Sequence, residues 1–566
     1  MSYRLDLDDI QGNVARAYGR YSYPFARYMF FNISHAAKGR AFVNDLLPYV
    51  TTAARWPKPE DKPPCTLNVG FTFMGLYRLQ LSNRVLQGMP EEFIAGMKDR
   101  AFLLGDRDQT VPESALGKWD KHWDQIWQDN RCIDNDHDVH VWISLNAQRK
   151  LSADNSHKDL NPKDPLLKVV EPVDDLARMT QTLRDLCDSN GGVRLIEGNG
   201  ASGTDPWHDA QAVFDQIDGL WLPTPREHFG FTDGIGDPVF AGQLPAKEER
   251  ERVVGRGKRM GSKDNGGWQP LNPGEFILGH PDEAQELPPS AHPPEFMRNG
   301  SFMAYRKLHE NVATFRRTVS DEAARYARVQ GISQEEADVT LRAKMVGRWP
   351  DGIPLAAAPT HAKWMDMRKA EGFEADTAMA RFAAQIAYLD KPEAANFRYA
   401  NDMQGYKTPL GAHMRRVNTR DYLDPLNATD AKADNPEATT ALNKRRRIMR
   451  RGLPYGTLPA DQQTDETEQG VTMMILCASL FRQFEFIQQQ WIQYGLDFHQ
   501  GNDTCPLLGN HEHHKRMAIP ADPASGTCPY TMSRLDTVVE CRGGDYFFIP
   551  SITALRAIAM GVVDPT

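Results

Sequence analysis

Hydrophobic and polar positions along the first 200 residues follow two different periods. Segment 66–73 ("TLNVGFTF") places apolar side chains at every second position, the period of a half-buried strand. Segment 175–188 spaces its leucine and methionine residues three or four positions apart, the period of an amphipathic helix. Together these patterns predict the order β-α-β-β-α-β, the order of a ferredoxin-like unit. The predicted elements cover residues 26–33, 34–50, 66–73, 139–145, 175–188 and 193–197.

The second half of the chain repeats this order of elements. Three segments there are rich in apolar, aromatic or β-branched side chains, as strands are: 301–308, 471–477 and 545–551. Ser479 is placed to cap the helix that follows the second of them. The other predicted elements are a helix opening at 310, a strand over 413–418, a helix over 480–494 and a terminal helix over 552–560.

Two such units in tandem predict the fold class α+β, with two tandem ferredoxin-like units whose antiparallel sheets face each other. We expect an N-terminal ferredoxin-like domain over 1–240, a linking loop region over 241–295 and a C-terminal ferredoxin-like domain over 296–566.

Composition and charge restrict the class of protein further. The chain has 566 residues, too many for one ordinary core, and a formal net charge of −9, which argues against a nucleic-acid partner. Its seven cysteines form no CxxC pair, as is typical of reduced thiols. The acidic N-terminus lacks the apolar stretch of a signal peptide, and no segment reaches the roughly 18 apolar residues of a membrane span. We therefore expect a cytoplasmic protein with no membrane association.

The stretch "REHFGFTDGIGDPVF" (226–240) places one carboxylate, Asp233, beside Gly234 and close behind two phenylalanines and Gly230. Glycine and aspartate are common turn formers, so a tight turn is the simpler interpretation. A functional carboxylate is the alternative, and this stretch alone does not decide between the two.

His413 lies in "TPLGAHMRRVNTRD", among several arginines. A cationic neighbourhood favours the neutral imidazole, which is the form that binds a metal. The alternative is a histidine that makes only ordinary hydrogen bonds. The run "KRRRIMRR" (444–451) likewise has three interpretations: a nucleic-acid patch, a solvated face, or a segment in which one arginine points inward to an anionic site.

Several blocks, taken in order, resemble the dye-decolourising peroxidases, a family of haem enzymes. "EHFGFTDGI" resembles the GxxDG signature of that family, and "LDDIQGNV" resembles its opening. The resemblance spans nearly the whole chain. It is specific because the blocks occur in the same order as in the family. The other blocks are "PGEFILGHPDE", "NGSFMAYRKL", "MVGRWPDGIPL", "PLGAHMRRVNTRD", "GLPYG", "RQFEFIQQQW" and "RGGDYFFIPSITALRA".

The resemblance implies a dimeric α+β barrel type of fold, with haem in the second unit and a role for individual residues. His413 would be the proximal ligand of the haem iron and Asp233 the distal acid–base residue. Arg450 would be the distal arginine, with Arg451 as the competing assignment. Asp503 is a candidate to orient His413. The other candidate cofactor-binding residues are Gly230, Phe231, Thr232, Gly234, Ile235, Arg416, Val471 and Met473.

One block departs from the family pattern. Where the family has "GLLF", this chain has "GVTM" (470–473), so Val471 and Met473 replace a leucine and a phenylalanine. That change loosens the distal pocket and brings an oxidisable thioether close to a peroxide site. Arg415, Arg416 and Arg420 would pair with haem propionates or form a solvated face.

The resemblance implies a peroxidase that binds haem b (iron protoporphyrin IX) and uses H2O2 to oxidise phenolics, dyes or other organic donors through a ferryl intermediate. We expect no nucleic-acid or membrane partner, and a homo-oligomer remains open. A haem carrier or sensor with little turnover is the alternative, motivated by "GVTM". An apo ferredoxin-like module that binds partners is the third.

Overall fold

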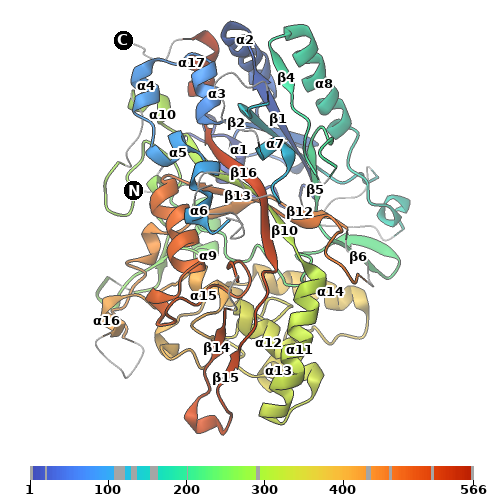
Figure 1. Ribbon diagram of the computed structural model, residues 1–566, viewed down its shortest axis with the longest axis vertical. Helices are drawn as coiled ribbons and strands as arrows, with labels where there is room; N and C mark the ends of the chain where they lie inside the picture. Colours follow the sequence, from blue (N-terminus) through green and yellow to red (C-terminus); the bar gives the residue numbers. More distant parts are fainter. Residues whose placement is uncertain are drawn as a thin grey trace.

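The computed structural model describes residues 4–19, 22–106, 122–128, 137–152, 163–200, 202–264, 266–287, 293–428, 435–457, 462–511 and 515–561. Within these ranges, helices α2, α8 and α17 cover one end of the molecule, while α11 to α14 form the opposite end (Figure 1). The strands of the large sheet run between the two groups. No helix in the described ranges is long and apolar enough to cross a membrane.

The first unit contains the predicted β-α-β-β-α-β order. Its elements are β1 (Phe25–Ile33), α2 (Ala36–Leu46), β2 (Cys65–Phe71), β3 (Val141–Ala147), α8 (Asp175–Asn190) and β4 (Val193–Leu195). β2 is buried along almost its whole length rather than half-buried, since the sheet is covered on both faces. Strand β5 (His208–Gln211) adds to the edge of β1, and α3 (Phe73–Arg78) follows β2.

The second unit repeats the order with longer insertions. Its elements are β10 (Ser301–Glu310), α11 (Val312–Gln330), β11 (Met449–Arg451), β12 (Pro454–Gly456), β13 (Gln469–Cys477), π-helical turns over Leu480–Glu485 and Ile487–Ile492, β16 (Val539–Ile549) and α17 (Ile552–Met560). The insertions include α12 (Gln334–Val346), α13 (His361–Ala370), α14 (Ala378–Asp390) and α15 (His413–Val417), as well as the β14 (Met517–Ile519) and β15 (Tyr530–Met532) pair. The α+β prediction of two tandem units is confirmed.

The strands of both units join in one antiparallel sheet, in the order β11-β13-β10-β16-β2-β3-β1-β4. The units meet where Phe548 of β16 pairs with Phe71 of β2. The outer edges also approach each other, because the ring of His208 in β5 lies 4.8 Å from that of Tyr455 in β12, and His208 Nε2 is 2.8 Å from Thr472 Oγ1. These contacts curve the sheet into a barrel.

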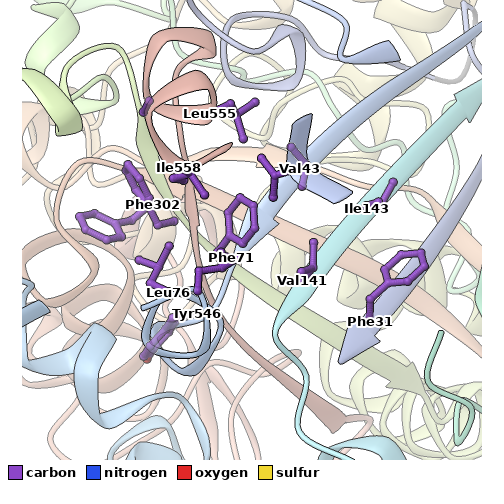
Figure 2. Packing of buried hydrophobic residues seen from close by; sticks show 14 of the residues in the cluster. Phe31, Val43, Phe71, Leu76, Val141, Ile143, Phe302, Tyr546, Leu555 and Ile558 are labelled. Carbon is purple, nitrogen blue, oxygen red and sulfur yellow. The ribbon is translucent and has the colours of Figure 1, made fainter. Parts of the chain in front are cut away.

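A large apolar cluster fastens helices α2 and α17 to the outer face of the sheet (Figure 2). Phe71 and Val141 of the first unit meet Phe302 and Tyr546 of the second within this cluster. Burying a side chain of this size contributes about 1.5–3 kcal/mol each. The two units therefore share one core, which fixes the second sheet relative to the first.

Two predicted elements differ in the structure. Segment 413–418 is not a strand but the short helix α15, and the strand expected there is supplied by β11 and β12. The helix after β13 is capped by Ser479, whose hydroxyl accepts from the Arg482 N–H, as predicted, but it winds as a π-helix. π-helical turns are rare and are frequent at functional sites.

Candidate active site

The segment carrying Asp233 is a tight turn and also presents a carboxylate. Gly230 has φ 92° and Gly234 has φ 80°, a region that only glycine adopts readily. The N–H and hydroxyl of Thr232 both donate to the Pro350 carbonyl, at 3.0 and 2.7 Å. The Asp233 N–H donates to the Pro225 carbonyl at 2.7 Å. These bonds fix the backbone on both sides of Asp233, while its side chain remains partly exposed.

Arg450 forms a bidentate ion pair with Asp233. Its Nη2 contacts Oδ1, and its Nη1 lies 3.4 Å from Oδ2. Successive side chains of a strand point to opposite faces, so Arg451 points away and pairs with Asp237 at 3.1 Å. Of the two arginines left open by the sequence, the structure brings Arg450 to Asp233.

His413 opens helix α15. Arg416, in the same helix, donates to the carbonyls of Gly411, Trp491, Tyr494 and Asp503, which holds α15 against the end of the π-helix. The Nδ1 atom of His413 lies 3.3 Å from the sulphur of Cys505. Among the described residues, no hydrogen bond reaches Nε2, and the ring is partly exposed. Nε2 is therefore free to bind a ligand.

Electrostatics connect these three side chains. The pKa of His413 is lowered to about 4, first by burial and then by the charge of Arg450, while Asp233 acts in the opposite direction. The pKa of Arg450 is raised, chiefly by Asp233. The site thus holds a neutral imidazole within electrostatic reach of a guanidinium–carboxylate pair.

A cavity of about 250 Å³ lies along the same face of the sheet. Its apolar lining is Leu308, Met473, Ile475, Phe484, Leu508 and Val539. Arg450 pairs directly with Ile475 across β11 and β13, so both side chains point to this face. The cavity lining includes none of His413, Asp233 and Arg450, and its Arg306 and Asp106 pair with each other. We therefore assign the chemistry to the three polar side chains and treat the cavity as neighbouring space.

Four buried arginines lie near one another, and two of them contact the segment that follows Asp233: Arg256, Arg348, Arg420 and Arg447. Arg256 donates to the Ile235 carbonyl at 3.0 Å and Arg447 to the Gly236 carbonyl at 3.3 Å. Burial lowers the pKa of Arg420 to about 10 and that of Arg447 to about 9. Nε of Arg420 is buried without a partner. Such a cluster favours binding of an anion.

Open space borders this cluster and the turn. A Cβ atom built on Gly230 or Gly236 would meet no atom within 4 Å. Phe229 and Phe231, by contrast, pack against Phe315 of α11, with ring centroids 4.3 and 6.1 Å away. Ile235 packs in a separate cluster with Trp349. The glycine backbone, and not the aromatic rings, therefore faces the free space.

Two buried glutamates were not found by sequence reasoning. Glu227 accepts the N–H groups of Phe229 and Phe231, both at 2.7 Å, and Glu310 at the end of β10 accepts that of His228 at 3.2 Å. Burial raises the pKa of Glu227 to about 7 and that of Glu310 well above its ordinary value. A proton is therefore retained between the two carboxyl groups, and they form a hydrogen bond with each other. Glu310 thus keeps a proton and donates it to Glu227. The sequence offered one signal for this pair, which is the acidic residue Glu227 in the stretch "REHFGFTDG".

This pair predicts a pH dependence of stability. A carboxyl group whose pKa is raised by folding stabilises the protein at a pH below the pKa that the group has in the unfolded chain. This contribution is lost as the pH rises through the pKa of the folded state. Relative to Glu310→Gln, wild type should lose roughly 1–3 kcal/mol of unfolding free energy between about pH 5 and about pH 8. Urea unfolding at each pH measures this difference. The exposed Glu335→Gln change should show no such trend, and a flat difference for Glu310→Gln would exclude a shared proton.

Comparisons with known proteins place the fold among characterised families. Residues 9–170 match the domain described as a DyP dimeric alpha+beta barrel domain. The chain is 24% identical to a dye-decolorizing peroxidase of Mycena epipterygia, over 98% of this chain and 87% of that protein. It is also 24% identical to the multifunctional dye peroxidase DyP2 of Amycolatopsis sp., over 98% and 96%.

Solved structures show the same fold. A dye-decolorizing peroxidase in complex with 2,6-dimethoxyphenol superposes with a TM-score of 0.66 at 21% identity, covering 98% of this chain and 100% of the other. A fungal DyP-type peroxidase from Auricularia auricula-judae gives 0.66 at 19% identity, covering 99% and 100%. The fold and these relatives define a peroxidase of the α+β barrel class. The chain is similar to the dye-decolourising peroxidases over 98% of its length, and residues 9–170 match their barrel domain.

The residues present fit the haem that this family implies. Nε2 of His413 is free, as an axial ligand requires. The open space at Gly230 and Gly236 allows a flat group to approach the backbone, and the positive charge of the nearby buried arginines suits two propionates. Arg420 donates through Nη1 to the Gly255 and Phe397 carbonyls and keeps an unpartnered Nε, whereas Nε of Arg416 already meets the Gly411 carbonyl.

Asp503 was expected to orient His413, but the structure shows no contact between their side chains. Its carbonyl accepts from Arg416 at 3.1 Å, and its carboxylate lies 4.0 Å from Arg516. The contact predicted for it is made by Cys505, two positions further along the chain. Val471 and Met473 are half-buried on β13, opposite Leu308 and Arg306, on the face of the sheet that carries Arg450.

Proposed function

We propose that the chain is a haem b peroxidase in which His413 binds the iron, Asp233 acts as acid–base and Arg450 stabilises negative charge. H2O2 is the oxidant, and phenolics and dyes are the reducing donors. The observation that carries this proposal is the bidentate Asp233–Arg450 pair within electrostatic reach of an imidazole whose Nε2 is free. The relatives, which are named for dye decolourisation, support the choice of donors.

The residues of the chain account for the proton transfers. Bound haem would supply the iron and the electrons needed to cleave the O–O bond. One carboxylate oxygen of Asp233 accepts a proton from H2O2 and returns it to the departing hydroxide, which leaves as water. Arg450 offers two N–H groups to the negative charge that develops on the departing oxygen. Since Arg450 already holds Asp233, the acid–base group and the cation are positioned together.

The ultraviolet–visible spectrum of the purified protein tests this proposal. Titration with haem should produce a Soret band at one haem per chain, and stopped-flow mixing with H2O2 should change that band rapidly. Oxidation of a phenol should follow. If haem binds but the spectrum stays static in peroxide, the chain is a carrier or sensor.

The carrier or sensor function is the second candidate because of two features of the site. Met473 lines the neighbouring cavity, where the phenylalanine of the family pattern would fill more of the space, and the partner of His413 is a thiol. Both features bear on turnover and leave haem binding intact. We propose the peroxidase first, because the Asp233–Arg450 pair has no role in simple haem storage.

Arg450→Leu should lower the second-order rate of reaction with H2O2 by about 100-fold, because one preorganised charge donor is typically worth this factor. Arg450→Lys keeps the charge but loses the planar fork, so we expect an intermediate rate. Stopped-flow kinetics with matched haem content measures both. A normal rate in Arg450→Leu would remove Arg450 from the mechanism.

A further inference from the structure

We infer that Cys505 is a positioning residue for His413: its sulphur receives the Nδ1 proton, keeps Nε2 free for iron, and leaves the imidazole a weaker electron donor than a carboxylate partner would. This inference deepens the proposed function and rests on it. It concerns the electronic character of the iron site and not only its existence.

The geometry places Cys505 Sγ within hydrogen-bond reach of His413 Nδ1. Cys505 is fully buried, and its own N–H donates to the Ile492 carbonyl at 2.7 Å, at the end of the π-helix. His413 Nδ1 lies 3.3 Å from this sulphur. Among the described residues no acceptor reaches Nε2, so the sulphur is the partner available to an imidazole proton.

The surroundings hold this position rigidly. The ring of His511 bridges two adjacent residues. Its Nε2 lies 2.9 Å from the Cys505 carbonyl and its Nδ1 lies 3.1 Å from Thr504 Oγ1. Arg416 ties the Asp503 carbonyl to helix α15 at 3.1 Å. The helix carrying His413 and the turn carrying Cys505 are therefore fastened to each other directly, so their contact is a fixed part of the fold.

The chemistry of sulphur decides what this contact does. An imidazole with its proton on Nδ1 has its lone pair on Nε2, as iron binding requires, and the acceptor at Nδ1 selects that tautomer. A carboxylate in this place accepts strongly and pushes electron density into the ring. Sulphur is a weak hydrogen-bond acceptor. Cys505 therefore fixes the tautomer while donating little charge, which favours a higher reduction potential for bound haem.

The experiment compares Cys505→Asp and Cys505→Ala with wild type, and Asp503→Asn serves as the matched control because its carboxylate faces Arg516. Cys505→Asp should lower the midpoint potential of the haem and raise the iron–histidine stretching frequency in resonance Raman spectra. Cys505→Ala removes the acceptor and should weaken haem binding by about 10–100-fold. Asp503→Asn should change neither readout. Equal potentials in wild type and Cys505→Asp would overturn the inference.

A second measurement separates this inference from the proposed function. In apo protein labelled with ¹⁵N-histidine, the chemical shifts of His413, identified by comparison with His413→Asn, report its tautomer directly. We expect the proton on Nδ1 in wild type and a mixture of tautomers in Cys505→Ala. A proton on Nε2 in wild type would overturn the inference whether or not haem binds. Haem titration of wild type then tests the proposed function by itself.

Discussion

His413→Ala should abolish tight haem binding while the apo protein remains folded. Nε2 of His413 has no hydrogen bond within the described ranges, and the low pKa of this imidazole keeps it neutral at physiological pH. The side chain is partly exposed, so its removal deletes little apolar packing. Titration with haem, followed at the Soret band, measures the loss. Circular dichroism checks the fold.

Two controls sharpen this result. The exposed His35→Ala variant should bind haem like wild type, since it removes a histidine far from α15 in the sequence and outside the site. His413→Gly leaves a cavity that exogenous imidazole can enter, so added imidazole should restore the Soret band. A His413→Ala protein that binds haem as tightly as wild type would require a different iron ligand.

The element order was predictable because apolar periodicity survives in both units. Strands β1, β10 and β13 were found from their composition, and α8 from its helical spacing. The prediction of a strand over 413–418 was wrong, because the short segment "HMRRVN" was assigned from its place in the element order. Arg416 is nevertheless buried against the carbonyls of distant segments, and this tertiary contact favours the helix. A local pattern cannot contain that information.

The residues of the site could be predicted from the sequence only where they lie in a recognisable motif. Asp233 and Arg450 were each assigned from a short block, but their ion pair joins residues 217 positions apart and required the structure. Glu310 and Cys505 have no motif of their own. Their roles come from the groups that the fold packs around them, a second carboxyl group in one case and the imidazole of His413 in the other.

Asp233→Asn should keep haem bound but slow the reaction with H2O2 by about 10²–10⁴-fold, the range typical of general acid–base catalysis. The amide retains the size of the side chain and accepts one hydrogen bond from Arg450, so the turn held by Thr232 should remain in place. An amide cannot accept the proton of H2O2, and this loss accounts for the slower rate. Stopped-flow kinetics at equal haem content measures it.

Asp237→Asn is the matched control, because Asp237 lies in the same segment but pairs with Arg451 on the other face of β11. It should react with H2O2 within a few-fold of the wild-type rate. If both variants were equally slow, the effect would lie in the stability of the segment and not in proton transfer. If Asp233→Asn were as fast as wild type, the proton would have to move through water held by Arg450, and the carboxylate would serve only to orient that arginine.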